Sequence, residues 1–349
     1  MNYKIGHLIV ICVALLLCVA CGEQRNAVAV VYKEHFPIDT MLPIKTYPAE
    51  ELVRPARMNR INNRVIAFGG YEEVGIYDYP DLKFIKKMVL PGRFSVSQGK
   101  DCLYLESGGE VDAYTLKSDS LCKTSSFFID KVSENIGTVQ ELNPGVYIYA
   151  DRRKHPGVSE YHVTDIQTGR NVSGGNYPEN DIRFKNLESF KSAYYHYLMM
   201  KPDRSAFVVT YASLRRIRIY DRNENLRHDV FLEGGLGNYK VVPARPSEQY
   251  WHFSCPFVTD RYIYLINPNQ LGAGPLLPHC NLLVLDWEGN LVAKYRFSVL
   301  INDIFVDEER KILCGSCSDY ESTRFFKMDL LDNLSLIHIS EPTRLRCIS

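Results

Sequence analysis

The sequence predicts an all-β protein folded as a six-bladed β-propeller, and three observations lead to this prediction. Short runs of β-branched and aromatic residues, bounded by Gly, Asp, Asn and Pro, fill the chain after residue 58. A unit built of such runs recurs six times. The period is about 40–60 residues, which is typical of propeller blades. Helical periodicity is nearly absent, and only residues 181–197 favour a helix or an irregular insertion.

Each copy of the unit contains a short apolar strand, a turn, a strand that ends in an aromatic or aliphatic residue plus Asp, and a further strand. The copies start at Val65, Cys102, Gly145, Ala206, Tyr262 and Asp303. In the fifth copy, Asp286-Trp-Glu-Gly-Asn290 places glycine where a tight hairpin needs a positive φ. The propeller is therefore expected to span residues 58–333, with four-stranded blades.

The sixth copy ends soon after Asp329, so the last blade is expected to be truncated. A propeller ring normally closes by pairing strands from both ends of the chain, and closure leaves only short edges. A strand in the lead-in, residues 21–57, is therefore expected to complete this blade. Ala27–Tyr32 has the composition of a strand, and the prolines after it predict an extended path.

Residues 1–20 have the layout of an export signal. A polar head with Lys4 precedes an unbroken apolar run, Leu8–Ala20. A membrane span needs roughly 20 apolar residues, whereas the apolar part of a signal peptide needs about 7–15. The small residue Ala20 then stands directly before Cys21. The pattern predicts a signal peptide rather than a membrane-spanning helix.

The stretch that ends at Cys21 resembles the lipobox of bacterial lipoproteins. This resemblance implies that Cys21 is acylated and becomes the first residue, so that lipid tethers the protein to a membrane. Two or more acyl chains anchor a protein stably. Cys18 departs from the lipobox, which usually has leucine there. The alternative is ordinary cleavage near Ala20, which releases a soluble protein.

Residues 334–349 are predicted to be foreign to the protein. Leu334–Arg344 resembles a sequencing-library adapter translated in frame, and a native tail is the alternative interpretation. Foreign tails are kept out of fold arguments.

Charge and cysteine spacing exclude some classes of function. Lysine plus arginine and aspartate plus glutamate each number 41, so the net charge is zero and no basic face for nucleic acid is indicated. Cysteines are scattered over the predicted propeller, and one CxxC pair, Cys314 and Cys317, lies inside a strand-like run. A zinc site needs a second pair of ligands at matching spacing. Structural cysteines are therefore favoured over a redox or metal site.

Four polar residues follow strands that have the character of innermost strands, and they are candidates for a cation site at the channel: Glu106, Asp151, Asn267 and Asp319. Solvated loop residues are the favoured interpretation.

Two aromatic segments, Tyr194–Tyr197 and Tyr250–Phe253, are suited to stacking on sugars or to packing, and packing is favoured. No catalytic, cofactor-binding or metal-binding residue is predicted, and Cys21 is the one predicted site.

Five segments of the chain carry a further resemblance: Met200–Arg204, Ile217–Asp221, Val258–Tyr264, Leu285–Val292 and Phe305–Glu308. They resemble the TolB-like six-bladed propeller lipoproteins of Bacteroidetes, and Asp286-Trp-Glu-Gly-Asn290 is the most specific part. The resemblance implies a propeller held in the cell envelope, anchored by lipid to the outer membrane. It implies no reaction, because a fold does not determine a function.

The predicted function is non-catalytic binding of an unknown ligand or partner protein by an envelope-anchored propeller. The alternative is a metal-dependent hydrolase or lactonase with its site in the propeller channel.

Overall fold

The structure is a computed structural model. It describes residues 28–49, 52, 57–70, 72–90, 92, 94–99, 101–129, 136–151, 159–178, 184, 187–233, 249–254, 256–272, 277–318 and 322–330. The predicted signal peptide, Cys21 and the predicted foreign tail lie outside the described residues.

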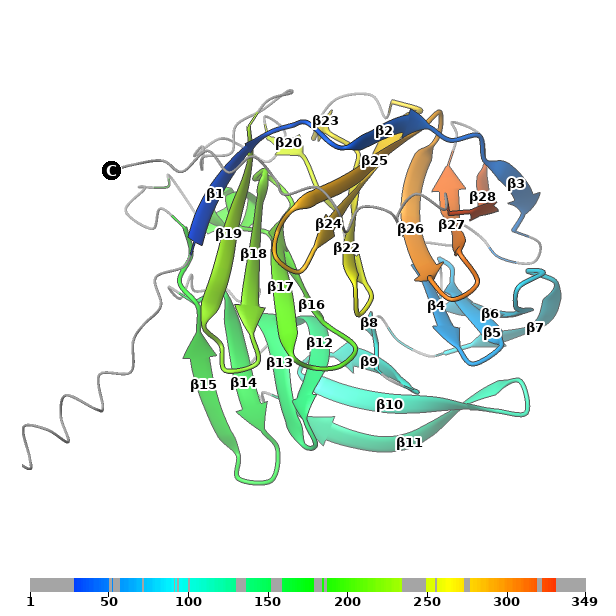
Figure 1. The fold of residues 1–349 in the computed structure, drawn as a ribbon. Helices are drawn as coiled ribbons and strands as arrows, with labels where there is room; N and C mark the ends of the chain where they lie inside the picture. Colours follow the sequence, from blue (N-terminus) through cyan, green and yellow to red (C-terminus); the bar gives the residue numbers. More distant parts are fainter. Residues whose placement is uncertain are drawn as a thin grey trace, which may run out of the picture.

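Six sheets, each with four antiparallel strands, surround a common axis and form the blades of a propeller (Figure 1). The predicted fold class is thus confirmed. The strands are given from the innermost to the outermost. Blade 1 contains β4 (Arg57–Ile61), β5 (Arg64–Phe68), β6 (Glu73–Asp78) and β7 (Phe84–Val89). Blade 2 contains β8 (Ser95–Gln98), β9 (Leu103–Ser107), β10 (Glu110–Lys117) and β11 (Ser120–Phe128). Blade 3 contains β12 (Ile136–Asn143), β13 (Val146–Asp151), β14 (Tyr161–Asp165) and β15 (Arg170–Gly174).

The second half of the ring follows the same plan. Blade 4 contains β16 (His196–Met200), β17 (Ala206–Tyr211), β18 (Arg216–Asp221) and β19 (Leu226–Glu233). Blade 5 contains β21 (Phe257–Val258), β22 (Tyr262–Asn267), β24 (Cys280–Asp286) and β25 (Leu291–Phe297). Blade 6 contains β26 (Leu300–Asp307), β27 (Ile312–Ser318), β28 (Thr323–Asp329) and, from the lead-in, β3 (Lys45–Pro48).

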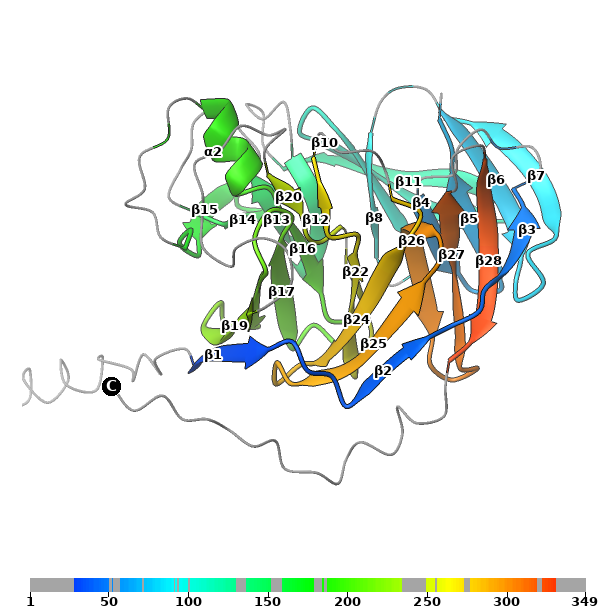
Figure 2. The ribbon, with the colours of Figure 1, turned by 90° about the horizontal axis from the view of Figure 1, so that it is seen from above.

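The lead-in runs along the rim of three successive blades (Figure 2). β1 (Val28–Lys33) pairs in parallel with β19, and β2 (Ile38–Met41) pairs in parallel with β25. β3 then pairs antiparallel with β28 and supplies the outermost strand of blade 6. The expectation that a lead-in strand completes the sixth blade is confirmed, and the blade predicted to be truncated has four strands.

The predicted runs correspond mainly to the second, third and outermost strands of each blade. Val65–Phe68, for example, lies in β5, the second strand of blade 1. The innermost strands β4, β8, β12, β16 and β21 were not predicted. They mix apolar and polar residues, and β21 has only two residues, so they carry little periodic signal.

The cores lie between neighbouring blades. Successive residues of a strand point to opposite faces. Val65 of β5 accordingly packs with Phe325 of blade 6, whereas the adjacent Ile66 packs with Leu103 of blade 2. Both faces of a blade are therefore buried, which explains why its central strands are continuous apolar runs.

A short helix, α2 (Leu187–Ala193), lies within the segment predicted to be helical or irregular. Beside the ring, β20 (Tyr250–Trp251) and β23 (Gln270–Leu271) form a separate two-stranded sheet. The Ser192 hydroxyl donates a hydrogen bond of 2.7 Å to Gln249, which joins the helix to this insertion. Within the part of the chain that the structure describes, no helix has the length and apolar character needed to cross a membrane.

Candidate functional site in the central channel

The innermost strands enclose a channel of about 620 Å³ on the axis of the ring. Its walls come from β4, β8, β12, β16, β21 and β26, so each blade contributes one strand. Many of the lining side chains are polar or charged, among them Arg57, Arg60, Gln98, Glu141, Lys201, Arg204, Asp260, Asp303, Asp307 and Glu308. This channel is the candidate functional site.

Side chains of the innermost strands bind the backbone of the next blade. The Ser97 hydroxyl of β8 accepts a hydrogen bond of 2.8 Å from the Val139 N–H of β12. The Thr138 hydroxyl of β12 donates to the Leu198 carbonyl of β16 at 2.7 Å. An innermost strand has no further strand on its channel side, so its buried polar groups need such partners. These bonds join neighbouring blades around the channel.

Asp303 performs the same role where the ring closes. Its Oδ2 atom accepts a hydrogen bond of 2.6 Å from the Met58 N–H, so β26 of blade 6 is bound to β4 of blade 1. The nearest Arg57 guanidinium nitrogen is 3.8 Å from Oδ1. Burial raises the pKa of the Asp303 carboxyl to about 6, although Arg57 and the backbone N–H groups oppose this effect. Asp303 is thus a buried acid whose pKa lies above its usual range.

Charged side chains gather where the innermost strands end, and they pair across blades. Arg204 of blade 4 binds Glu141 of blade 3. The Thr259 hydroxyl of blade 5 donates to Glu308 of blade 6 at 2.6 Å. The mouth of the channel therefore presents charges that are already engaged and fixed in position.

Asp307, at the end of β26, is the most heavily bonded of these acids. It accepts bonds from Arg60 at 2.6 Å, the Tyr79 hydroxyl at 2.9 Å and Arg310 at 3.0 Å. Burial acts to raise the pKa of this carboxyl, but the bonds from Arg310 and Tyr79 and the charge of Arg60 outweigh it, so the pKa is lowered. Asp307 is an ionised anchor of the blade 1 and blade 6 junction.

The polar residues considered for a cation site do not converge. Glu106 is the last residue but one of the second strand of blade 2, and it accepts a hydrogen bond of 2.9 Å from the Gly109 N–H. Asn267 ends the second strand of blade 5 and donates to the His252 carbonyl at 2.7 Å. The strands interpreted as innermost are second strands, so these residues lie away from the channel walls. The Asp151 side chain and Asp319 lie outside the described residues, and among the described residues no group of three acids, histidines or cysteines could hold a metal.

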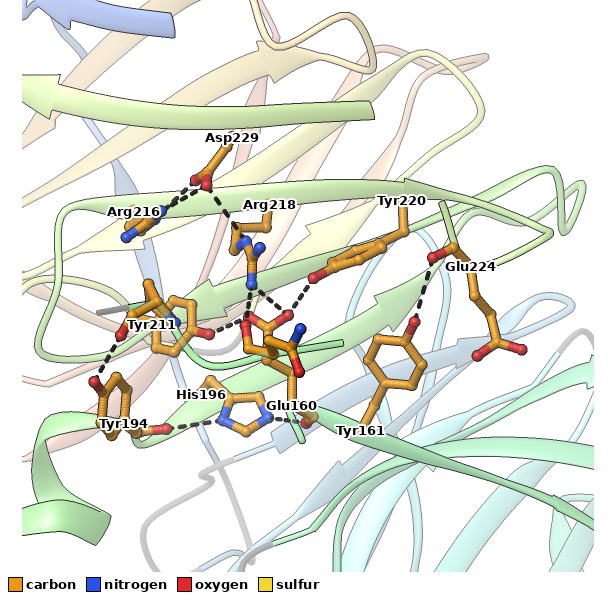
Figure 3. A network of polar contacts seen from close by, with 12 residues as sticks. Glu160, Tyr161, Tyr194, His196, Tyr211, Arg216, Arg218, Tyr220, Glu224 and Asp229 are labelled. Atoms are coloured by element: carbon orange, nitrogen blue, oxygen red, sulfur yellow. Dashed lines mark hydrogen bonds and ion pairs between the residues drawn. The ribbon is translucent and has the colours of Figure 1, made fainter. Parts of the chain in front are cut away.

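A second polar cluster, which the sequence did not reveal, lies between blades 3 and 4 (Figure 3). Glu160, directly before β14, is fully buried and binds Arg218 of β18 at 2.6 Å. The hydroxyl groups of Tyr211 and Tyr220 both donate to the Glu160 carboxylate. Burial and the nearby Glu160 charge raise the pKa values of both tyrosines, so they stay protonated donors.

The cluster continues along blade 4. Arg216 forms two bonds to Asp229, at 2.6 and 2.8 Å, and Asp229 also lies 3.5 Å from Arg218. These side chains are buried, and none of them lines the channel. The cluster links two blades rather than offering a surface for a ligand.

The CxxC cysteines are buried in separate cores. Cys314 and Cys317 both lie in β27, and their odd spacing places them on opposite faces of the strand. Cys314 packs between blades 6 and 1, and Cys317 packs between blades 5 and 6. Burial raises the pKa of the Cys314 thiol to about 12, despite the nearby Lys327. The arrangement supports the structural interpretation of the pair.

The two aromatic segments are mostly packed. The Tyr194 ring contacts Tyr177, Phe184 and Phe190, and Phe253 is completely buried. Trp251 is the exception, because 45% of its surface is exposed. Packing is thus the main role of these segments.

No family model and no curated protein matches this chain. Two solved structures are similar to it in fold. One is a member of the DUF4221 family from Bacteroides vulgatus, with 11% identity, a TM-score of 0.59 and coverage of 83% of this chain and 98% of that one. The other is a Bacteroides fragilis protein named only as an exported protein, with 11% identity, a TM-score of 0.53 and coverage of 86% and 98%. At this identity the likeness shows that the chain shares the fold of these Bacteroides proteins, and it shows the fold alone.

Proposed function

We propose that this chain is an envelope lipoprotein, anchored to the outer membrane through lipid on Cys21, whose propeller binds a polar ligand or a partner protein at the channel. Two lines of evidence support the location. The first residues have the layout of a signal peptide that ends at a lipobox-like cysteine. A protein of similar fold is named as exported.

The observation that carries the binding role is the channel itself. It is a cavity of about 620 Å³, a size suited to small ligands. Its charged groups are held in place by partners on neighbouring blades, such as Arg204 by Glu141 and Arg60 by Asp307. A preorganised array of this kind binds without paying to order its side chains.

A pair of matched substitutions tests binding at the channel. Met199 lines the channel, whereas Met41 lies on the outer rim and is 66% exposed. Calorimetry on the full chain would use a panel of amino acids, dipeptides, monosaccharides and oligosaccharides. A probe that binds should lose at least about tenfold in affinity in Met199→Trp and keep its affinity in Met41→Trp. Equal affinity in both variants, or no binding by any probe, would count against a small-molecule site in the channel.

One observation favours the hydrolytic part of the alternative, a hydrolase or lactonase with its site in the channel, and it does not bear on a metal. Asp303 lines the channel with a pKa of about 6, and a carboxyl tuned in this way can act as a general acid or base near neutral pH. Hydrolysis of simple esters and lactones, abolished by a chelator and reduced at least about a hundredfold in Asp303→Asn, would favour the enzyme over the binding module.

A further inference from the structure

We propose that the His196 side chain is a cation, protonated on both ring nitrogens, which joins blade 3 to blade 4 by hydrogen bonds. The stability of the protein then depends on the pH at which this side chain loses a proton. This inference is independent of the ligand at the channel. It rests on the two bonds that the imidazole ring makes and on the groups that surround it (Figure 3).

His196 is the first residue of β16, and its ring is 1% exposed. Its Nδ1 atom lies 2.8 Å from the Tyr194 carbonyl oxygen, and its Nε2 atom lies 2.6 Å from the Glu160 carbonyl oxygen. A carbonyl oxygen only accepts hydrogen bonds, so each ring nitrogen must be a donor. Only the imidazolium form carries hydrogens on both nitrogens. The geometry therefore assigns a positive charge to His196.

The two bonds join different blades. Glu160 directly precedes β14 of blade 3, whereas Tyr194 and His196 belong to the start of blade 4. Loss of one proton would leave a ring nitrogen facing a carbonyl oxygen at hydrogen-bond distance. Water cannot replace the lost bond easily, because the ring is buried. Deprotonation therefore weakens the contact between the blades.

Several charged or titratable groups among the described residues surround the ring. They are Glu160 of blade 3, Arg218 of β18, Tyr211 of β17, Tyr177 and Tyr194. Burial keeps Tyr211 protonated, so it is neutral. Glu160 and Arg218 form an ion pair at 2.6 Å, so their charges offset one another. Arg216 and Asp229 form a second ion pair at 2.6 Å in the same cluster. The Tyr194 and Glu160 carbonyl oxygens accept the two N–H groups of the imidazolium, so both of its protons take part in the contact between the blades.

The direction of the pH effect follows from linkage. A histidine in an unfolded chain loses its proton near pH 6.5. Because both ring nitrogens donate to carbonyl oxygens in the folded state, the folded protein holds this proton more firmly, so the stabilisation is fully present below pH 6.5 and is lost as pH rises further. In that range the unfolding constant of the wild type, relative to a variant without the imidazole, rises by up to tenfold per pH unit.

His252 provides a matched control. It is also 1% exposed, but its Nδ1 atom faces the Asn269 side-chain oxygen at 2.7 Å, and burial lowers its pKa to about 4. The ring is therefore neutral throughout the range in which His196 titrates. Its linkage has the opposite sign, because its contribution is lost as pH falls from 6.5 towards 4.

The experiment compares urea unfolding of the full chain, His196→Asn and His252→Asn between pH 5.5 and 9. Above pH 6.5 the difference in stability between the wild type and His196→Asn should shrink with rising pH, whereas the difference for His252→Asn should stay constant. Above pH 6.5, equal pH slopes for the wild type and His196→Asn would overturn the proposal.

A second measurement needs only the folded wild type and covers the case in which His196→Asn fails to fold. Nitrogen NMR of the histidine rings, assigned with His252→Asn and substitutions of the other histidines, should show one buried ring with both nitrogens protonated above pH 7. A neutral His196 ring at pH 6 would refute the proposal that both ring nitrogens are protonated.

Discussion

At the scale of the residue, hydrogen bonds of buried polar side chains join the last blade to the first. Asp303 supplies the acceptor for the Met58 N–H at the junction of the last and first blades. The adjacent Gly315 has no room for a side chain, because a Cβ atom there would lie 2.3 Å from the Asp303 carbonyl oxygen. The strands β26 and β27 therefore lie close together at this point, where burial of the Asp303 carboxylate is unfavourable.

Asp303→Asn is expected to be more stable than the wild type at pH 7. Burial raises the folded pKa of this carboxyl from 3.8 to about 6, so its stabilisation is present below pH 4 and is lost as pH rises through 6. The loss amounts to at most about 3 kcal/mol at 1.36 kcal/mol per pKa unit. Asparagine keeps an oxygen for the Met58 N–H and cannot ionise. Urea unfolding between pH 3.5 and 7.5 should show the wild type losing stability relative to the variant as pH rises, and a difference that stays constant with pH would contradict this prediction.

Glu160→Gln should destabilise the fold by about 3–5 kcal/mol, because it removes the nearer of the two carboxylates beside the buried Arg218 charge. Glu309→Gln, at an exposed position, should change stability by less than about 0.5 kcal/mol. Adding Arg218→Met to Glu160→Gln should recover part of the loss, since the buried Arg218 charge is then removed as well. Chemical denaturation of the four proteins measures this, and no recovery in the double variant would show that packing rather than charge dominates.

At the scale of the element, burial on both faces decides what the sequence reveals. The second strand of blade 1 is buried from Val65 to Phe68 and is therefore a plain apolar run. The innermost strand β4 contains Arg57, Asn59 and Arg60, which line the channel. Because of these polar residues β4 is not an apolar run, so the sequence does not predict it as a strand. The candidate site lies on these innermost strands, so it could not be found from periodicity.

Strand geometry also determines the chemistry of the CxxC pair. Because Cys314 and Cys317 face different cores, they cannot form a disulfide without disruption of β27. Maleimide labelling of the peptide that carries them is expected to be slow in the folded protein and rapid in urea. A disulfide between the two, detected by mass spectrometry of the folded protein, would contradict the structure.

The lead-in strands differ in importance, and stepwise truncation should show it. A chain without residues 1–27 retains β1, β2 and β3 and should be as stable as the full chain. A chain without residues 1–43 loses β1 and β2, together with the Glu34 carboxylate that binds Lys294 at 2.6 Å, and should melt at a lower temperature. A chain without residues 1–49 loses β3 as well, exposes the edge of β28, and is expected to aggregate. Equal thermal stability of the last two chains would mean that β3 does not close the ring.

At the scale of the whole molecule, the lead-in binds the ring from outside. Glu34 follows β1 and pairs with Arg215 of blade 4 and Lys294 of blade 5, so one carboxylate joins the lead-in to two blades. A tether at the N-terminus would therefore attach to a firmly held part of the propeller.

The lipid anchor is tested with the whole protein in its cell. Palmitate supplied to growing cells should label the wild type and leave Cys21→Ala unlabelled. The envelope fraction should retain the wild type, and the variant should be released. Equal absence of label in both proteins would favour ordinary signal cleavage near Ala20.

The sequence by itself determined the fold class, the number of blades and the need for a closing strand, because apolar strand runs between turn residues recur along the whole ring. It also indicated a helix or irregular insertion around α2 and a structural role for Cys314 and Cys317. Only the tertiary structure decided which strands line the channel, and that β3 completes blade 6. It alone revealed that Asp303 meets Met58 and that Glu160 meets Arg218. The two residues of each pair lie far apart in the chain. A local sequence pattern does not predict which blade faces pack against one another when the ring closes.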